Sequence, residues 1–207
     1  MTQIKICGLF RPCDIDYANE VRPDYIGFIL NFPKSHRNLS PEQAAELRRN
    51  LDPRIKSVGV FVNQPQETIL MAAEMIGLDI IQLHGQEDND FIAGLKQKSG
   101  LPVWKAFKVR QPSDLIAAQE SIADEILLDN GYGTGEAFDW SYAASFTRPF
   151  ILAGGLTPEN IPEALAVLHP KQLDISSGVE TDKCKDRDKM LAAVQAVRTF
   201  DEKEKQI

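Results

Sequence analysis

Eight short apolar runs, alternating with helical patterns, constrain the fold of this chain of 207 residues more than any other feature. Short apolar runs bounded by polar or turn-forming residues are typical of buried β-strands. The predicted strands are Ile4–Cys7, Tyr25–Leu30, Ser57–Val62, Ile80–Leu83, Val103–Lys108, Glu125–Asp129, Phe150–Ala153 and Gln172–Ile175. Strands that alternate with helices pair in parallel through right-handed crossovers, so the pattern predicts a parallel sheet.

The segments between the strands carry signals for helix starts. Ser40-Pro41-Glu42-Gln43 combines a cap residue, a proline at the first helical position and a capping-box glutamine. Thr157-Pro158-Glu159 repeats the cap and the proline. The predicted helices include Glu42–Arg49, Glu67–Ile76, Asp88–Lys98, Ser113–Ile122, Glu159–Leu168 and a final helix over Asp186–Arg198.

Eight strand–helix units predict an α/β fold, the closed (β/α)8 TIM barrel. Without a sign of a domain break, we expect a single barrel domain over residues 1–207, with a C-terminal tail that frays from about residue 200. The alternative is an open doubly wound sheet, which would have fewer strands and a GxGxxG loop after the first one. Gly8-Leu9-Phe10-Arg11-Pro12 at that place does not have this motif, and its absence favours the barrel.

Composition excludes several classes of function. The formal net charge of −7 argues against binding to nucleic acid or to an anionic membrane surface. No apolar run is long enough to cross a bilayer, and the first residues do not resemble a signal peptide. The three cysteines lack metal-type spacing, and reduced thiols in a cytoplasmic protein account for them most simply.

Two features mark a possible site at the carboxyl ends of the strands, where parallel sheets bind their ligands. Cys7 ends the first predicted strand, and it is either an active-site thiol or a buried structural cysteine. Glycine-bearing turns follow the seventh and eighth strands, where barrels commonly bind phosphate through backbone N–H groups. We therefore predict a phosphate site, with the candidate residues Gly154, Gly155, Ser177 and Gly178.

Several motifs, taken in order along the chain, resemble one known family. They are Lys5-Ile6-Cys7-Gly8, Gly59-Val60-Phe61-Val62-Asn63, Gln82-Leu83-His84-Gly85, Leu127-Leu128-Asp129, Phe138-Asp139-Trp140, Gly154-Gly155-Leu156 and Asp174-Ile175-Ser176-Ser177-Gly178-Val179-Glu180. Together they resemble the phosphoribosylanthranilate isomerases of tryptophan biosynthesis, over almost the whole chain. The resemblance implies a (β/α)8 barrel that acts without a metal or an organic cofactor.

The resemblance also implies the reaction and the two residues that perform it. The expected reaction is the Amadori rearrangement of N-(5′-phosphoribosyl)anthranilate to 1-(2-carboxyphenylamino)-1-deoxyribulose 5-phosphate. Cys7 is then the general base and Asp129 the general acid, although an aspartate at a strand end often only caps a turn. Free thiols titrate at about 8.5 and free aspartic acids at about 3.9, so we expect both pKa values to shift toward neutrality.

Further site residues follow from the same resemblance. Arg37 matches the arginine that binds the anthranilate carboxylate, and Asp174 matches an aspartate that contacts the substrate. His84 is expected to be a hydrogen-bonding part of the site wall, and with only three unclustered histidines a metal is not expected. Lys5 points to the same side of its strand as Cys7, so it either stabilises the thiolate or pairs with an interior acid such as Asp174.

One loop departs from the family pattern. Tyr132 stands where the family usually has glycine, and Glu136 stands where it has lysine, in the loop after Asp129. The alternatives to the expected function are another sugar-phosphate isomerase of the phosphate-binding barrel group and a non-catalytic barrel that binds a phosphorylated ligand. We expect a small phosphorylated aminosugar as substrate and a monomer or a homodimer as the active form.

Overall fold

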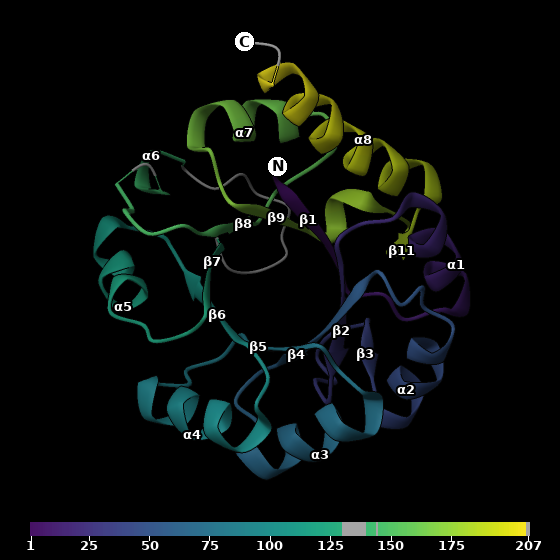
Figure 1. Ribbon diagram of the computed structural model, residues 1–207, viewed down its shortest axis with the longest axis vertical. Helices are drawn as coiled ribbons and strands as arrows, with labels where there is room; N and C mark the ends of the chain where they lie inside the picture. The colour runs from purple at the N-terminus through teal and green to yellow at the C-terminus, as the bar shows by residue number, and fades with distance from the viewer. Residues whose placement is uncertain (130–139, 144, 206–207) are drawn as a thin grey trace.

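A closed ring of eight parallel strands forms the centre of the molecule in the computed structural model, which describes residues 1–129, 140–143 and 145–205 (Figure 1). Each strand pairs in parallel with the next, and the first strand pairs with both the second and the last, which closes the ring. The barrel strands are β1 (Gln3–Cys7), β2 (Tyr25–Leu30), β4 (Lys56–Phe61), β5 (Ile80–Leu83), β6 (Val103–Lys108), β7 (Glu125–Asp129), β8 (Ile151–Ala153) and β9 (Gln172–Ile175). The predicted (β/α)8 barrel is confirmed.

Helices cover the outside of the ring (Figure 1). They are α1 (Pro12–Val21), α2 (Pro41–Arg49), α3 (Gln66–Ile76), α4 (Asn89–Ser99), α5 (Leu115–Gln119), α6 (Trp140–Ala143), α7 (Ile161–Leu168) and α8 (Arg187–Glu204). The short elements are β3 (Asn38–Leu39), β10 (Glu180–Thr181), β11 (Cys184–Lys185), and the 3₁₀ turns η1 (Pro112–Asp114) and η2 (Ser177–Val179).

Side-chain caps begin α2, α4 and α8. At α2 the predicted capping box is present, because the Ser40 hydroxyl accepts from the Gln43 N–H and the Gln43 side chain accepts from the Ser40 N–H. The predicted start of α7 at Glu159 is wrong. Asn160 caps this helix, and its side chain bridges the Thr157 N–H and the Gly155 carbonyl, which keeps the preceding residues in a turn.

Two apolar cores lie on the two faces of the barrel wall, because successive side chains of a strand point to opposite faces. Alternate residues such as Ile4, Ile6 and Phe28 pack outward against the helices. The inward residues fill the barrel below its mouth, and their buried apolar members are Val58, Ile80, Trp104, Ala106, Leu127, Ile151 and Ala153. The barrel interior is thus a packed core, and only its upper end is left for a ligand.

The C-terminal helix is longer than the predicted Asp186–Arg198. Helix α8 continues to Glu204, because the buried Asp201 carboxylate accepts hydrogen bonds from the backbone N–H and the hydroxyl of Thr2 at 2.7 and 3.1 Å. Arg198 adds bonds to the Thr2 carbonyl and to Asp24. These contacts join the last part of α8 to the N-terminal segment, and the fraying expected from about residue 200 stays a prediction.

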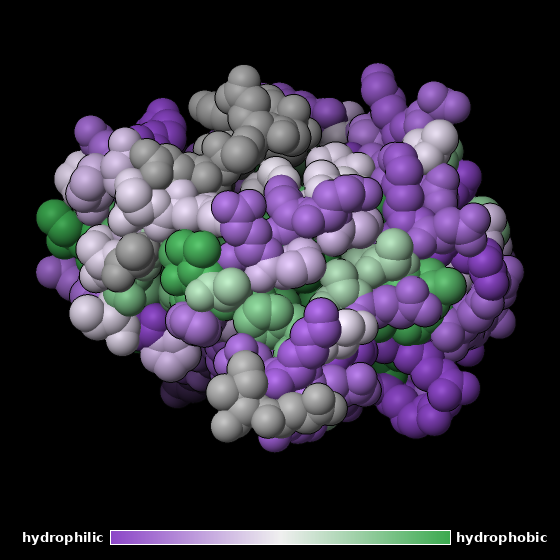
Figure 2. Space-filling model, turned by 90° about the horizontal axis from the view of Figure 1, so that it is seen from above, coloured by the Kyte–Doolittle hydropathy of each residue, from purple (hydrophilic) through white to green (hydrophobic). Residues whose placement is uncertain are grey.

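The outer surface is mixed in polarity. The face in Figure 2 carries hydrophilic side chains over most of its area, with hydrophobic side chains in patches between them. Among the described residues, no helix has both the length and the apolar character needed to cross a membrane.

Candidate active site

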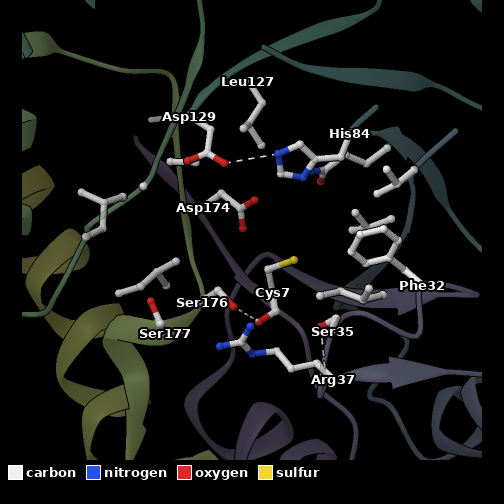
Figure 3. Close-up of a pocket in the computed structure, with 18 of the residues that line it drawn as sticks. Cys7, Phe32, Ser35, Arg37, His84, Leu127, Asp129, Asp174, Ser176 and Ser177 are labelled. Carbon is white, nitrogen blue, oxygen red and sulfur yellow. Dashed lines mark hydrogen bonds and ion pairs between the residues drawn. The ribbon is translucent and has the colours of Figure 1, made fainter. Parts of the chain in front are cut away.

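A pocket of about 680 Å³ opens at the carboxyl ends of the strands. Its lining includes Cys7, Arg37, His84, Asp129, Gly154, Gly155, Asp174 and Ser177, so the fold brings together eight of the nine predicted site residues (Figure 3). The ninth, Gly178, is not part of the lining, but its neighbour Ser177 is. Strand ends far apart in the sequence therefore supply one concave site, as expected for a parallel barrel.

Cys7 is the last residue of β1, and its thiol points into the pocket (Figure 3). Its register partner on β2 is Gly27, where a methyl group would lie 2.8 Å from the Cys7 sulfur. Burial raises the pKa of the Cys7 thiol above its ordinary value, and the nearby cations Lys5 and Lys185 offset this only in part. The structure therefore contradicts the expected lowering of this pKa.

Lys5 lies one layer below Cys7 in the barrel interior, where its side chain is fully buried. Its ammonium group donates to both carboxylate oxygens of Asp174 at 2.9 Å. Burial opposes the charge of Lys5, but Asp174 and then Cys7 outweigh it and raise the lysine pKa. Lys5 thus pairs with Asp174, as one of its two interpretations predicts, and stabilisation of the Cys7 thiolate by Lys5 stays a prediction.

Asp129 ends β7 and faces His84, which follows β5 (Figure 3). The distance from His84 Nε2 to Asp129 Oδ2 is 3.2 Å, within reach of a hydrogen bond. The histidine side chain is 28% exposed and that of the aspartate 12%, so both reach the pocket without being solvated freely. His84 therefore stands in the site wall and restrains the carboxyl group.

The glycine turns after β8 and β9 lie against each other at one side of the pocket. Gly154 and Gly155 have φ values of 88° and 65°, a region that favours glycine. A methyl group at Gly178 would lie 1.8 Å from the Leu156 carbonyl oxygen, so the two turns are packed backbone against backbone. Backbone N–H groups in such turns can approach an anion closely.

Arg37 reaches the pocket from the loop after β2, but its guanidinium already has a partner. Its Nε and Nη2 donate to the two carboxylate oxygens of Glu180 at 2.6 and 2.7 Å. The buried Lys185 also donates to Glu180, at 2.6 Å. Sequence reasoning assigned nothing to Glu180 or Lys185. The only available signal was the place of Glu180 at the end of a matched motif.

Gln82 was missed in the same way. It lies on β5 in the pocket lining, it is almost completely buried, and its amide oxygen has no hydrogen-bond partner in the described part of the chain. A buried polar atom without a partner is rare in a folded protein and points to a ligand or water. The signal in the sequence was a glutamine within the apolar run Ile80–Leu83.

Two expectations are left as predictions. Tyr132 and Glu136, in the loop that departs from the family pattern, lie outside the described residues. Within the described residues no group of three His, Cys, Asp or Glu side chains could hold a metal ion. The expectation that the protein needs neither a metal nor an organic cofactor stays a prediction.

A closed barrel with a thiol, a carboxyl group and glycine turns around one pocket at the strand ends is typical of a (β/α)8-barrel enzyme. Comparison with known proteins makes the class more specific. The family model described as N-(5′-phosphoribosyl)anthranilate (PRA) isomerase matches residues 4–196.

Named relatives agree with this match. The N-(5′-phosphoribosyl)anthranilate isomerase of Thermoanaerobacter sp. (strain X514) is 44% identical over 205 residues, which cover 96% of this chain and 98% of the relative. The structure of phosphoribosyl anthranilate isomerase from Thermotoga maritima is 35% identical, with a TM-score of 0.85. The match covers 96% of this chain and 100% of the chain in that structure. Another isomerase structure, in complex with reduced 1-(o-carboxyphenylamino)-1-deoxyribulose 5-phosphate, has a TM-score of 0.84 at 34% identity. The match covers 96% of this chain and 100% of the chain in that structure.

This chain belongs to the N-(5′-phosphoribosyl)anthranilate isomerase family.

Proposed function

We propose that this chain, an isomerase of tryptophan biosynthesis, rearranges N-(5′-phosphoribosyl)anthranilate to 1-(2-carboxyphenylamino)-1-deoxyribulose 5-phosphate with Cys7 as base and Asp129 as acid. One observation carries the proposal of these roles. A thiol and a carboxyl group, both nearly buried, line the same pocket at the ends of two different strands, beside the glycine turns. Acid–base catalysis needs such a pair held within reach of one substrate.

The first step belongs to Asp129. Its carboxyl group gives a proton to the ring oxygen of the ribose, and the bond from C1′ to that oxygen breaks. The lone pair of the anilino nitrogen forms the C1′=N bond, which leaves a protonated Schiff base. His84, 3.2 Å from the carboxyl oxygen, keeps the acid directed at the ring oxygen.

The second step belongs to Cys7. Its thiolate removes the proton from C2′, and the electron pair of that C–H bond forms the C1′=C2′ bond while the Schiff base becomes an amine. The enolamine then loses its hydroxyl proton and gains one at C1′, which gives the ketone. Lys5 and Lys185 favour the thiolate of Cys7, whereas burial and Asp174 oppose it.

Binding is divided among three parts of the pocket. The glycine turns after β8 and β9 hold the phosphate through backbone N–H groups, with Gly154, Gly155, Ser177 and Gly178 forming them. Arg37 binds the anthranilate carboxylate, since a guanidinium can give a carboxylate two parallel hydrogen bonds. Asp174 contacts the sugar or the anilino nitrogen from the pocket floor.

The test follows the loss of phosphoribosylanthranilate fluorescence with purified protein. Cys7→Ser and Asp129→Asn should each lower kcat by roughly 10²–10⁴-fold or more, because neither new side chain can perform its proton transfer. The control is Cys13→Ser, which changes a thiol on α1 outside the pocket and should keep wild-type kinetics. Near-normal turnover in Cys7→Ser would remove this thiol from the mechanism.

We also propose that residues 1–207 form one domain and act as a monomer or a homodimer. The unbroken ring of strands and the bonds between α8 and the N-terminal segment support a single domain. If the chain is one domain, urea or heat should unfold it in a single cooperative transition. Light scattering of the purified protein measures the number of subunits. Two separate transitions would contradict the single domain.

A further inference from the structure

The pairing of Arg37 with Glu180 leaves one edge of the guanidinium open. A guanidinium can bind a carboxylate side-on through Nε and Nη2, or end-on through Nη1 and Nη2. Glu180 holds the side-on edge, with distances of 2.6 and 2.7 Å. Nη1 makes no hydrogen bond within the described residues. A second carboxylate could therefore approach Arg37 end-on without displacing the first.

Glu180 is itself held firmly. It is the register partner of Lys185 in the β10–β11 hairpin, whose turn residues Asp182 and Lys183 have φ values of 52° and 63°. The Lys185 ammonium group donates to Glu180 at 2.6 Å and to the Ser176 carbonyl at 3.0 Å, and its side chain is fully buried. The hairpin thus fixes the carboxylate beside the pocket.

The charges leave Arg37 able to attract an anion. Burial opposes the charge of Glu180, but Arg37 and Lys185 outweigh it and hold the pKa of this carboxyl group below its ordinary value. Glu180 is therefore ionised at neutral pH, and the positive charge of Lys185 balances it. Arg37 and Lys185 share this one carboxylate, and among the described residues no other carboxylate pairs with either, so a positive charge is available to a ligand.

The surroundings of Arg37 favour one orientation of its side chain. At Gly8, in the loop after β1, a methyl group would lie 2.4 Å from Arg37 Cδ, so only glycine lets the arginine lie in this place. Figure 3 shows the side chain running beneath Cys7, with its guanidinium directed toward Ser176 and Ser177. All these residues except Gly8 line the pocket.

From these contacts we infer that Glu180 is a positioning residue, which holds the side-on edge of Arg37 so that Nη1 and Nη2 meet the substrate carboxylate end-on, with Lys185 as its counterion. The inference rests on the proposed function, because it takes Arg37 as the residue that binds the anthranilate carboxylate. One guanidinium then joins two carboxylates, one from the protein and one from the substrate. Preorganisation of this kind reduces the cost of ordering a long side chain on binding.

The first test is Glu180→Gln. A glutamine has a single oxygen to accept from either Arg37 or Lys185, and its NH₂ group faces the other cation. Arg37 should lose its fixed orientation, so KM should rise about tenfold or more, while kcat stays within about threefold. The inhibition constant of inorganic phosphate should stay within about twofold, because the glycine turns are unchanged.

The matched control is Glu20→Gln. Glu20 also binds an arginine with both oxygens, but this pair with Arg187 is exposed and remote from the pocket. Its kinetics should equal those of the wild type. In an Arg37→Ala background, Glu180→Gln should change KM by less than about twofold, since its effect passes through Arg37. An unchanged or lower KM in the single variant Glu180→Gln would overturn the inference, and a lower value would mean that Glu180 competes with the substrate.

The second test does not depend on the folding of a variant. Wild-type protein is crystallised with reduced 1-(o-carboxyphenylamino)-1-deoxyribulose 5-phosphate, and the hydrogen bonds of Arg37 are examined. The ligand carboxylate should lie on Nη1 and Nη2 while Glu180 stays on Nε. A ligand carboxylate on Nε, with Glu180 displaced, would overturn the inference and keep the role of Arg37. A carboxylate away from Arg37 would overturn both, while turnover by the wild type would still support the proposed reaction.

Discussion

At the scale of single residues, the surroundings of Cys7 decide how the base works. The Cys7 side chain is almost fully buried, with the Lys5–Asp174 ion pair below it and the pocket above it. Burial raises its pKa, and the carboxylate of Asp174 adds to this effect. These surroundings therefore favour the thiol over the thiolate, and the proposed base must lose this proton before it acts.

This leads to a prediction on pH. Burial raises the pKa of the Cys7 thiol, so the fraction of thiolate should keep rising with pH from about 7 to about 9. In a Cys13→Ser/Cys184→Ser background, the rate of Cys7 alkylation by iodoacetamide should rise over this range. A plateau of this rate below about pH 7 would show that the free enzyme already holds a thiolate.

At the scale of elements, the contact between two loops shapes the proposed phosphate site. The turn after β9 crosses the turn after β8 so closely that Gly178 lies against the Leu156 carbonyl. Neither turn could keep this position alone, since each supplies part of the surface on which the other rests. The predicted helix starts and the glycines were readable in the sequence, but this contact needs both loops in place.

The corresponding prediction concerns Gly178→Ala. The added methyl group would meet backbone at 1.8 Å, so the two turns must separate. KM and the inhibition constant of inorganic phosphate should both rise by about tenfold or more, with a smaller effect on kcat. Gly94→Ala on α4 is the control, because its methyl group would meet only the flexible side-chain amide of Gln66, and kinetics should not change. Unchanged phosphate inhibition in Gly178→Ala would argue against the phosphate site.

At the scale of the whole molecule, buried ion pairs join neighbouring strands of the barrel. Glu87 accepts from the Lys105 ammonium group on β6 at 2.9 Å, and from the backbone N–H groups of Asn63 and Gly85 at 2.7 and 2.9 Å. One carboxylate therefore ties the loops after β4 and β5 to β6. Burial opposes its charge, but these partners outweigh burial and lower the pKa of Glu87.

The lowered pKa has a predictable effect on stability. The unfolded chain binds a proton at Glu87 more readily than the folded protein, so the stabilisation is present above the ordinary pKa and is lost as pH falls through the folded value. Glu87→Gln should lower the free energy of unfolding by about 3 kcal/mol near neutral pH, because Lys105 is left buried without its partner.

Urea unfolding at about pH 7 and about pH 3.5 measures this effect. The difference between Glu87→Gln and the wild type should shrink at the lower pH, where the wild type also loses the carboxylate charge. Glu20→Gln, in an exposed pair, should differ from the wild type by less than about 0.5 kcal/mol at both pH values. A difference for Glu87→Gln that grows on acidification would contradict the assigned direction of the pKa.

Much of the architecture could be read from the order of residues. The predicted bounds of β2, β5, β6, β7 and β9 are those of the structure, β1 and β8 differ by one residue at the start, and β4 lies one residue earlier at both ends. Buried parallel strands are apolar on both faces, and this composition is visible locally. The hairpin β10–β11, α1 and the end of α8 were not predicted. The end of α8 depends on a partner distant in the sequence, because Asp201 accepts hydrogen bonds from Thr2.

By itself, then, the sequence determined the barrel, the placing of Cys7, Asp129 and the glycine turns at strand ends, and the family resemblance, because each depends on local pattern and chain order. The tertiary structure alone decided two properties of the site. Glu180 pairs with Arg37 across 143 residues of sequence, and the pKa of Cys7 rises although a lysine lies beside it. The ion pair and the raised pKa both depend on which charged groups lie within a few ångströms of each other in the protein interior. The order of residues does not specify those distances.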